Sequence, residues 1–200
     1  ADGEDAGALV KNADIAMYHS KNNGKGTCSF SSRLMKEDLT ERIELTNYLY
    51  RALEHDELEV YYQPLISIGS KKIVGFEALL RWNHPEKGLL LPEKFIHLAE
   101  HTRLINPIGK WVLETVCRQM KAWHDRNLGA IRVAVNMSVV QFLDPNLLDI
   151  VKTAIQETGV DPKSLELEIT ESIATNKSLN IEPILRALKE IGVLIAIDDF

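Results

Sequence analysis

The sequence is poor in the features that mark secreted, thiolate-metal and membrane proteins. It contains only two cysteines, Cys28 and Cys117, in no CxxC or Cys/His spacing, which is typical of unpaired thiols in a reducing cytosol. No apolar run approaches the roughly 20 residues that a membrane helix needs. The opening stretch ADGEDAGALV is acidic, lacks a signal-peptide pattern and does not begin with Met. We therefore expect a piece of a cytoplasmic protein, with any membrane anchor in other parts of the parent.

Basic residues are outnumbered as well. The chain has 23 Lys and Arg against 29 Asp and Glu, which gives a formal net charge of -6. A broadly basic surface for DNA or RNA is therefore not expected. An acidic protein can still bind an anionic substrate where metal ions neutralise its carboxylates. No GxGxxG or GxxxxGK[ST] loop follows any predicted strand, which disfavours a nucleotide-binding doubly wound sheet.

The chain does contain a regular alternation of apolar strands and amphipathic helices. A helix that ends near Asn22, a short strand-like segment at 27–30 and a long helix at 32–55 come first. The later alternation implies parallel strands with helical crossovers, as in an α/β barrel or a doubly wound sheet. The predicted strands are 58–66, 72–80, 131–135, 165–169 and 193–197, and the predicted helices are 92–100, 107–126, 145–158 and 181–191.

Four of these strands have apolar runs, at 72–76, 131–135, 165–167 and 193–197, that finish on an acid or amide side chain, which we expect to mark the strand end. These side chains are Glu77, Asn136, Glu168 and the pair Asp198-Asp199. In a parallel barrel the carboxyl ends of all strands meet on one face, so we expect these side chains to converge. Oxygen donors without thiolate or imidazole suit Mg²⁺ or Mn²⁺. Each residue could instead cap the helix that follows its strand. The adjacent acids favour a metal site, because like charges repel unless a cation lies between them.

An ordered set of motifs resembles the EAL domain family. The central motif is GFEALLRW at 75–82, preceded by YYQP at 61–64 and followed by NHP at 83–85, VNMS at 135–138, LEITES at 167–172 and IDDF at 197–200. The resemblance covers roughly residues 39–200. It implies an α/β fold, a TIM-like (β/α) barrel of the EAL type, truncated after about five strands. The domain would occupy residues 56–200 and be incomplete at its C-terminus, with a linking helix and the start of the domain at 32–55.

The opening segment resembles the C-terminal end of a GGDEF diguanylate cyclase domain. The motif NADIAMY at 12–18, with Lys21, Gly24 and Phe30, carries this resemblance. It implies that residues 1–31 are the remnant of such a domain in a tandem GGDEF–EAL protein. The GGDEF motif itself is not in the chain, so no cyclase activity is assigned.

The EAL resemblance implies a phosphodiesterase that hydrolyses cyclic di-GMP to linear pGpG with two divalent cations, Mg²⁺ or Mn²⁺. It also implies a possible homodimer through the EAL domain. Residue by residue, it implies catalytic roles for Glu77, Asp198 and Asp199, metal binding by Glu77, Asn136, Glu168, Asp198 and Asp199, substrate contacts by Gln63, Leu79 and Arg81, and support of a neighbouring loop by Glu171.

The activity of this piece of the chain is a separate question. The family's catalytic Lys, a further Glu for the second metal and a late Gln are expected after Phe200. We therefore expect the parent to be active and these residues alone to be inactive and poorly soluble, because an unclosed barrel exposes strand edges. The alternative function is a catalytically degenerate EAL domain that acts as a cyclic di-GMP receptor or regulatory module.

Overall fold

The computed structural model describes residues 5–22, 26, 28–129, 131–175 and 181–198. The chain forms two compact units, Ala1–Leu49 and Tyr50–Phe200. The first contains α1 (Ala6–Asn22) and most of α2 (Arg33–Ala52). The strand predicted at 27–30 is wrong for its described residues, since 28–30 are not in a strand. Ser29 is tied there by a side-chain hydrogen bond to Ser20 of 2.8 Å between hydroxyl oxygens, not by a ladder of backbone bonds.

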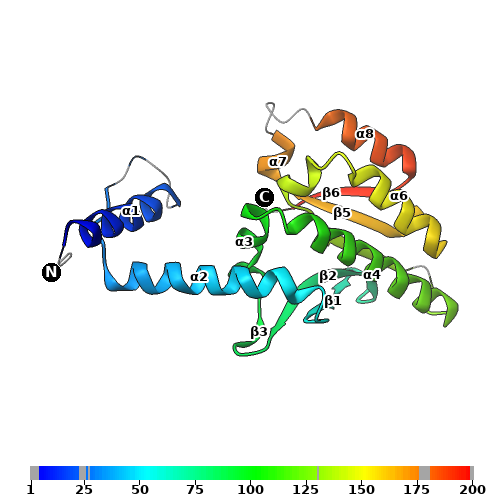
Figure 1. The fold of residues 1–200 in the computed structure, drawn as a ribbon. Helices are drawn as coiled ribbons and strands as arrows, with labels where there is room; N and C mark the ends of the chain where they lie inside the picture. Colours follow the sequence, from blue (N-terminus) through cyan, green and yellow to red (C-terminus); the bar gives the residue numbers. More distant parts are fainter. Residues whose placement is uncertain (1–4, 23–25, 27, 130, 176–180, 199–200) are drawn as a thin grey trace. The chain divides into compact units, whose positions relative to one another are not determined.

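A mostly parallel sheet of six strands organises the second unit (Figure 1). The strand order is β1-β2-β4-β5-β6, with β3 also paired to β2. The ladders from β2 through β4 and β5 to β6 are parallel, as the sequence predicts, while β1 and β3 run antiparallel to β2. The strands are β1 (Leu58–Ile66), β2 (Ile73–His84), β3 (Gly88–Leu90), β4 (Arg132–Asn136), β5 (Leu165–Thr170) and β6 (Leu194–Asp198).

The first two strands have no predicted helix between them and do not pair in parallel. β1 and β2 form an antiparallel hairpin whose register runs from Leu58 opposite Trp82 to Ile66 opposite Ile73. Only residues 67–72 connect them, and a parallel connection needs a dozen or more residues. β2 also continues past the predicted end at residue 80, because its last residues pair with β3.

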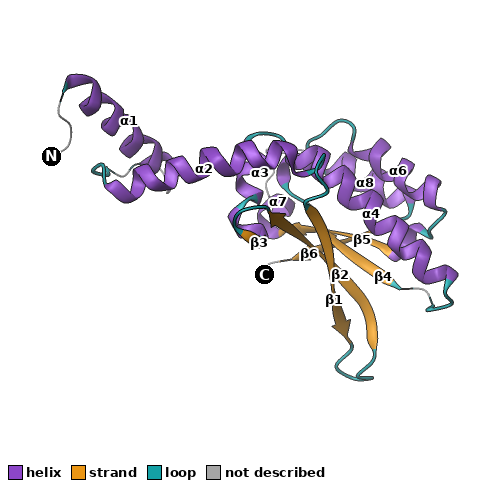
Figure 2. Ribbon diagram, turned by 60° about the horizontal axis from the view of Figure 1, so that its bottom comes forward, coloured by secondary structure: helices purple, strands orange, loops and turns teal. Residues whose placement is uncertain are grey.

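Long amphipathic helices cover one face of this sheet (Figure 2). They are α4 (Ile105–Asp125), α6 (Leu147–Thr158) and α8 (Glu182–Ile191). α4 buries Ile108, Val112 and Val116, whose spacing of four residues places them on one side of the helix. In β5, Leu165, Leu167 and Ile169 are buried and alternate with more exposed residues, so the apolar face of the strand meets the helices. α6 and α8 end at Gly159 (φ 67°) and Gly192 (φ 103°), a left-handed conformation that favours glycine.

Along the chain, shorter helical segments connect the strands and the long helices. They are η1 (Pro92–Lys94), α3 (Ile96–His101), α5 (Val139–Phe142), η2 (Pro162–Ser164) and α7 (Glu171–Thr175). The continuous helix predicted at 92–100 is broken at Phe95, which is fully buried at φ −136°. Its ring packs edge-on to Trp82 with centroids 5.4 Å apart, so tertiary packing overrides the helical pattern.

Across the described ranges, no helix is both long and apolar enough to cross a membrane.

Candidate active site

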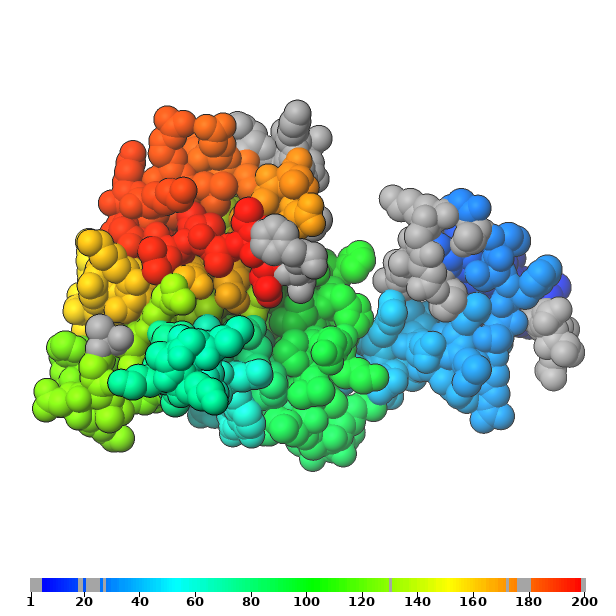
Figure 3. All heavy atoms as spheres, turned by 180° about the vertical axis from the view of Figure 1, so that it is seen from behind, coloured from blue at the N-terminus to red at the C-terminus, as the bar shows by residue number. Residues whose placement is uncertain are grey.

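The sheet register places the predicted site residues of the strands on one face. Glu77 pairs with Ala134, Asn136 with Glu168 and Thr170 with Asp198. Side chains alternate between the faces along each strand, so paired residues and those two apart share a face. This face is opposite the one that α4, α6 and α8 cover, and atoms of β6, in red, lie at the surface in Figure 3. The residues on it are Gln63, Glu77, Leu79, Arg81, Asn136, Glu168 and Asp198.

Two of these residues lie inside strands and not at strand ends, which corrects the prediction. The ladder between β2 and β4 stops at Ala78 opposite Val135, but β2 continues to His84 through its antiparallel partners. Glu168 is likewise followed by two more residues of β5. Asn136 and Asp198 do end their strands, as predicted.

A hydrogen bond joins the first two candidate ligands across neighbouring strands. The Asn136 side-chain amide donates from Nδ2 to Glu77 Oε1 at 2.7 Å. This bond leaves the Asn136 carbonyl oxygen as the atom that the residue can offer to a cation. It links residues 59 positions apart in the sequence, which only the parallel ladder brings together.

Glu168 lies in an electrostatically unfavourable position. Its Oε2 is buried and accepts no hydrogen bond from any described residue. Burial first, and then the nearby carboxylates of Glu77, Asp198 and Glu166, raise the pKa of this carboxyl to about 7, against the opposing effect of Arg132. A cation at this point would remove the repulsion, so the oxygen-only donor set fits a hard divalent ion.

The described residues do not form a complete metal cage as they stand. Among the residues that the structure describes, no three His, Cys, Asp or Glu side chains are arranged to hold a metal ion. The Asn136 amide adds an oxygen that such a cluster of acids does not include. Asp199, the predicted ligand of a second cation, lies outside the described residues.

An open cavity of about 620 Å³ lies beside these residues. Glu77, Asn136 and Asp198 line it, together with Leu79. It also includes Thr170, which sequence analysis missed although it follows Glu168 by two residues and therefore shares its face. Further lining residues come from the segment before α4, where no strand-end pattern could indicate them, and these are Glu93, His97 and Glu100.

The predicted substrate contacts lie on β1 and β2. Gln63 is exposed directly opposite Glu77. The Arg81 guanidinium lies over the Tyr61 ring, 5.5 Å from its centroid, and donates from Nη1 to the Leu80 carbonyl at 2.8 Å. Neither Gln63 nor Arg81 is among the residues that line the 620 Å³ cavity.

Glu171 is the first residue of α7, and its side chain is exposed. The described contact is to its backbone carbonyl, which accepts a 2.9 Å hydrogen bond from Thr175 Oγ1. The predicted support of a loop by the Glu171 carboxylate remains a prediction.

Polar side chains at the carboxyl ends of parallel strands, beside a cavity, are typical of the binding or active site of an α/β domain. The EAL domain family matches residues 46–200, and the chain belongs to this family. The predicted fold class, α/β of the EAL type, is confirmed by structural similarity to EAL domains.

Several characterised proteins resemble this chain. It is 42% identical over 200 residues to MucR of Pseudomonas aeruginosa, a bifunctional diguanylate cyclase/cyclic di-GMP phosphodiesterase, covering 100% of this chain and 29% of MucR. It is 37% identical over 199 residues to the cyclic di-GMP phosphodiesterase NbdA of the same organism, covering 100% of this chain and 25% of NbdA. The chain thus spans less than a third of the length of these relatives.

Structural similarity agrees with this assignment. A solved structure of the PaMucR phosphodiesterase in complex with c-di-GMP superposes with a TM-score of 0.76 at 43% sequence identity. The superposition covers 78% of this chain and 64% of that one.

Proposed function

We propose that the protein hydrolyses cyclic di-GMP to linear pGpG with two divalent cations, Mg²⁺ or Mn²⁺, at the carboxylate face of its sheet. The observation that carries this proposal is the register that brings Glu77, Asn136, Glu168 and Asp198 to one face. The named activities of MucR and NbdA support it.

The proposal divides the carboxylates and the amide between two cations. Glu77, Asn136, Glu168 and Asp198 would hold the first cation, and Asp198 with Asp199 would hold the second. When bound, such a pair supplies an activated water and stabilises the attacking and leaving oxygens of an in-line displacement. The hydrogen bond from Asn136 to Glu77 orients both of these side chains before any ligand arrives.

The substrate is proposed to lie against β1 and β2. The planar guanidinium of Arg81 is suited to two oxygens of one phosphate, and its contact with Tyr61 restricts its orientation. Gln63 would contribute an amide and Leu79 an apolar contact. Glu171 would hold a neighbouring loop.

The segment at residues 1–31 is proposed to be the C-terminal end of a GGDEF domain. The match to the bifunctional MucR over 200 residues supports this interpretation, because it includes this segment.

The test is turnover of cyclic di-GMP by the whole protein with Mg²⁺ or Mn²⁺, followed by chromatography of pGpG. We expect Glu77→Gln to lower kcat/KM by roughly 100-fold or more, since changes around metal ligands already cost 10–100-fold. Glu157→Gln, an exposed acid on α6, should leave turnover unchanged. Tight binding of cyclic di-GMP without turnover would instead identify a receptor. The absence of both binding and turnover would refute the proposal.

A further inference from the structure

The backbone that follows Asn136 is fixed by reciprocal hydrogen bonds at the start of α5. The Ser138 backbone N–H donates to Gln141 Oε1 at 2.9 Å, and the Gln141 N–H donates to Ser138 Oγ at 3.4 Å. Such a capping box satisfies two donors that a helix start would otherwise leave unpaired. One residue before Ser138, the Met137 N–H donates to the Glu168 carbonyl at 2.8 Å. The segment from Asn136 to Ser138 is thus tied to β5 and to the Gln141 side chain.

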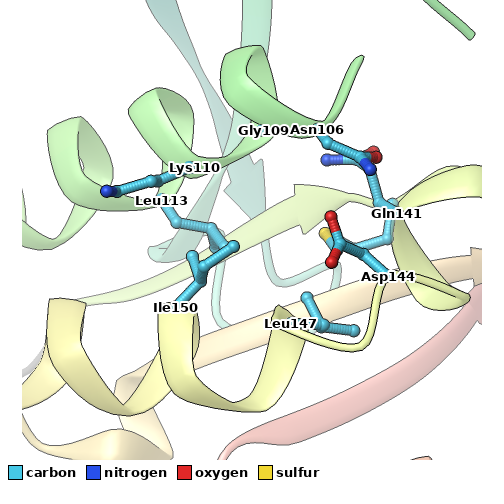
Figure 4. Close-up of a pocket in the computed structure, with 9 residues that line it drawn as sticks. Asn106, Gly109, Lys110, Leu113, Gln141, Asp144, Leu147 and Ile150 are labelled. Atoms are coloured by element: carbon cyan, nitrogen blue, oxygen red, sulfur yellow. The ribbon is translucent and has the colours of Figure 1, made fainter. Parts of the chain in front are cut away.

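The Gln141 side chain is in turn enclosed by α4 (Figure 4). It is 7% exposed, and α4 carries a glycine, Gly109, at the point of contact. A Cβ at position 109 would lie 1.8 Å from Gln141 Nε2 and 2.9 Å from its Cδ. Any larger residue at position 109 would therefore force the amide of Gln141 to move. The absence of a side chain at Gly109 sets where that amide lies.

Polar groups of neighbouring elements surround the same amide. Gln141, Asn106 and Asp144 line a small cavity of about 10 Å³ among α4, α5 and α6. Asn106 Oδ1 is buried there and accepts no hydrogen bond from any described residue. Gln141 also lines the 620 Å³ cavity that contains Glu77 and Asn136. The residue therefore lies between the interior of the helical layer and the candidate active site.

We propose that Gln141 is a positioning residue of this site, which fixes the Asn136–Ser138 backbone and thereby the Asn136 amide. The inference rests on the proposed cation binding, in which Asn136 presents its carbonyl oxygen to the ion. Gln141 touches neither cation nor substrate in this role. It acts through the Ser138 N–H, two residues from Asn136, and through its fixed place against Gly109.

The direct test replaces Gln141 with leucine in the whole protein. Leucine has a similar volume but cannot accept the hydrogen bond from Ser138, so the backbone after Asn136 keeps its bond to β5 but loses its bond to the Gln141 side chain. We expect Mn²⁺ affinity, measured by isothermal titration calorimetry, to weaken by roughly 10–100-fold, as for other groups that orient metal ligands. The side-chain amide signals of Asn136 in ¹⁵N NMR spectra should shift in the absence of any metal, because the bond to Glu77 is disturbed.

A second pair of variants tests the contact with α4. Gly109→Ala should displace the Gln141 amide and weaken Mn²⁺ binding in the same direction. In a Gln141→Ala background the added methyl group has room, so Gly109→Ala should cause no further loss. Equal additional losses in both backgrounds would show that Gly109 acts without Gln141 and would overturn this part of the inference.

Asp161→Ala is the matched control for a lost cap. Asp161 Oδ1 accepts a 3.0 Å bond from the Lys163 N–H at the start of η2, before β5 and at the other end of the sheet. We expect it to lower stability without changing Mn²⁺ affinity. The inference is wrong if Gln141→Leu binds Mn²⁺ like the wild type and leaves the Asn136 signals in place. If the wild type binds no Mn²⁺, the proposed cation site fails, while the Asn136 signals still report whether Gln141 positions that amide.

Discussion

At the scale of single residues, Glu168 combines burial with like charge on several sides. Its carboxyl lies on the same face as those of Glu77, Asp198 and Glu166, and among the described residues it is Arg132 that opposes them. Arg132 is itself paired with Glu166 at 3.0 Å. The positive charge that opposes them at Glu168 is thus already shared, and a divalent cation would supply the charge that the side chains lack.

This environment predicts that the metal-free protein loses stability as the pH rises from about 4.5 to about 7. The folded state holds the proton of Glu168 up to a pKa of about 7, whereas the unfolded chain releases it near the ordinary value of 4.5. Over that window the native state binds more protons, so the free energy of unfolding falls with pH and then levels off. Glu168→Gln removes this dependence. The difference in the free energy of unfolding between this variant and the wild type should change by on the order of 2 kcal/mol from pH 5 to pH 8.

Urea unfolding in EDTA at several pH values measures this difference. Glu171→Gln is the control, since it removes an exposed carboxylate three residues further along the chain. It should follow the pH dependence of the wild type. Parallel curves for Glu168→Gln and the wild type would show that the buried carboxyl does not titrate as the structure indicates.

At the scale of elements, local patterns predicted most strands and helices but not how far each extends. The apolar runs at β4, β5 and β6 lie within about a residue of the predicted bounds, because their burial depends on their own composition. The extension of β2 to His84 depends on pairing with β1 and β3, which are separate segments of the chain. The same pairing is why Glu77 lies within a strand.

The candidate site shows the same division. The strand residues could be predicted, since acids and an amide follow apolar runs in a parallel sheet. Glu93, His97 and Glu100 could not, because their place beside the cavity depends on how the segment before α4 folds back. Gln141 had a local signal, the Ser-x-x-Gln spacing of a capping box, which indicates a helix start without indicating a site.

Contact between β2 and β4 requires a glycine at position 75. A Cβ there would lie 2.7 Å from the carbonyl oxygen of Arg132, a backbone atom that cannot move aside without shifting β4. We predict that Gly75→Ala lowers the free energy of unfolding by roughly 1–3 kcal/mol, as overpacking does elsewhere. The register between Glu77 and Asn136 should loosen with it. Urea unfolding measures the loss of stability.

Gly69 provides the control for this substitution. It lies in the turn between β1 and β2, and a Cβ there would meet no atom within 4 Å. Gly69→Ala should change stability by no more than about 0.5 kcal/mol. Similar losses at both positions would point to a general effect of glycine replacement, and the close approach of β2 to β4 would not explain them.

At the scale of the whole molecule, a net charge of -6 coexists with a concentration of acids on one sheet face. Helices and apolar side chains occupy the other face. The acids that repel one another and the apolar core of the second unit therefore lie on opposite sides of one sheet. A cation that binds only the folded acids would therefore stabilise the whole unit. Such stabilisation grows with the ratio of free ion to dissociation constant.

We predict that Mn²⁺ at about 100 times its dissociation constant adds about 2.7 kcal/mol to the free energy of unfolding, or roughly 5–10 °C in Tm. Any salt also screens an acidic protein, so sodium chloride at matched ionic strength must be compared. Asp198→Asn and Glu157→Gln each remove one negative charge, but only Asp198 lies on the site face. Site binding requires that Asp198→Asn abolish most of the Mn²⁺ effect while Glu157→Gln retains it. Equal responses in both variants would reduce the effect of Mn²⁺ to screening, because net charge alone would then account for it.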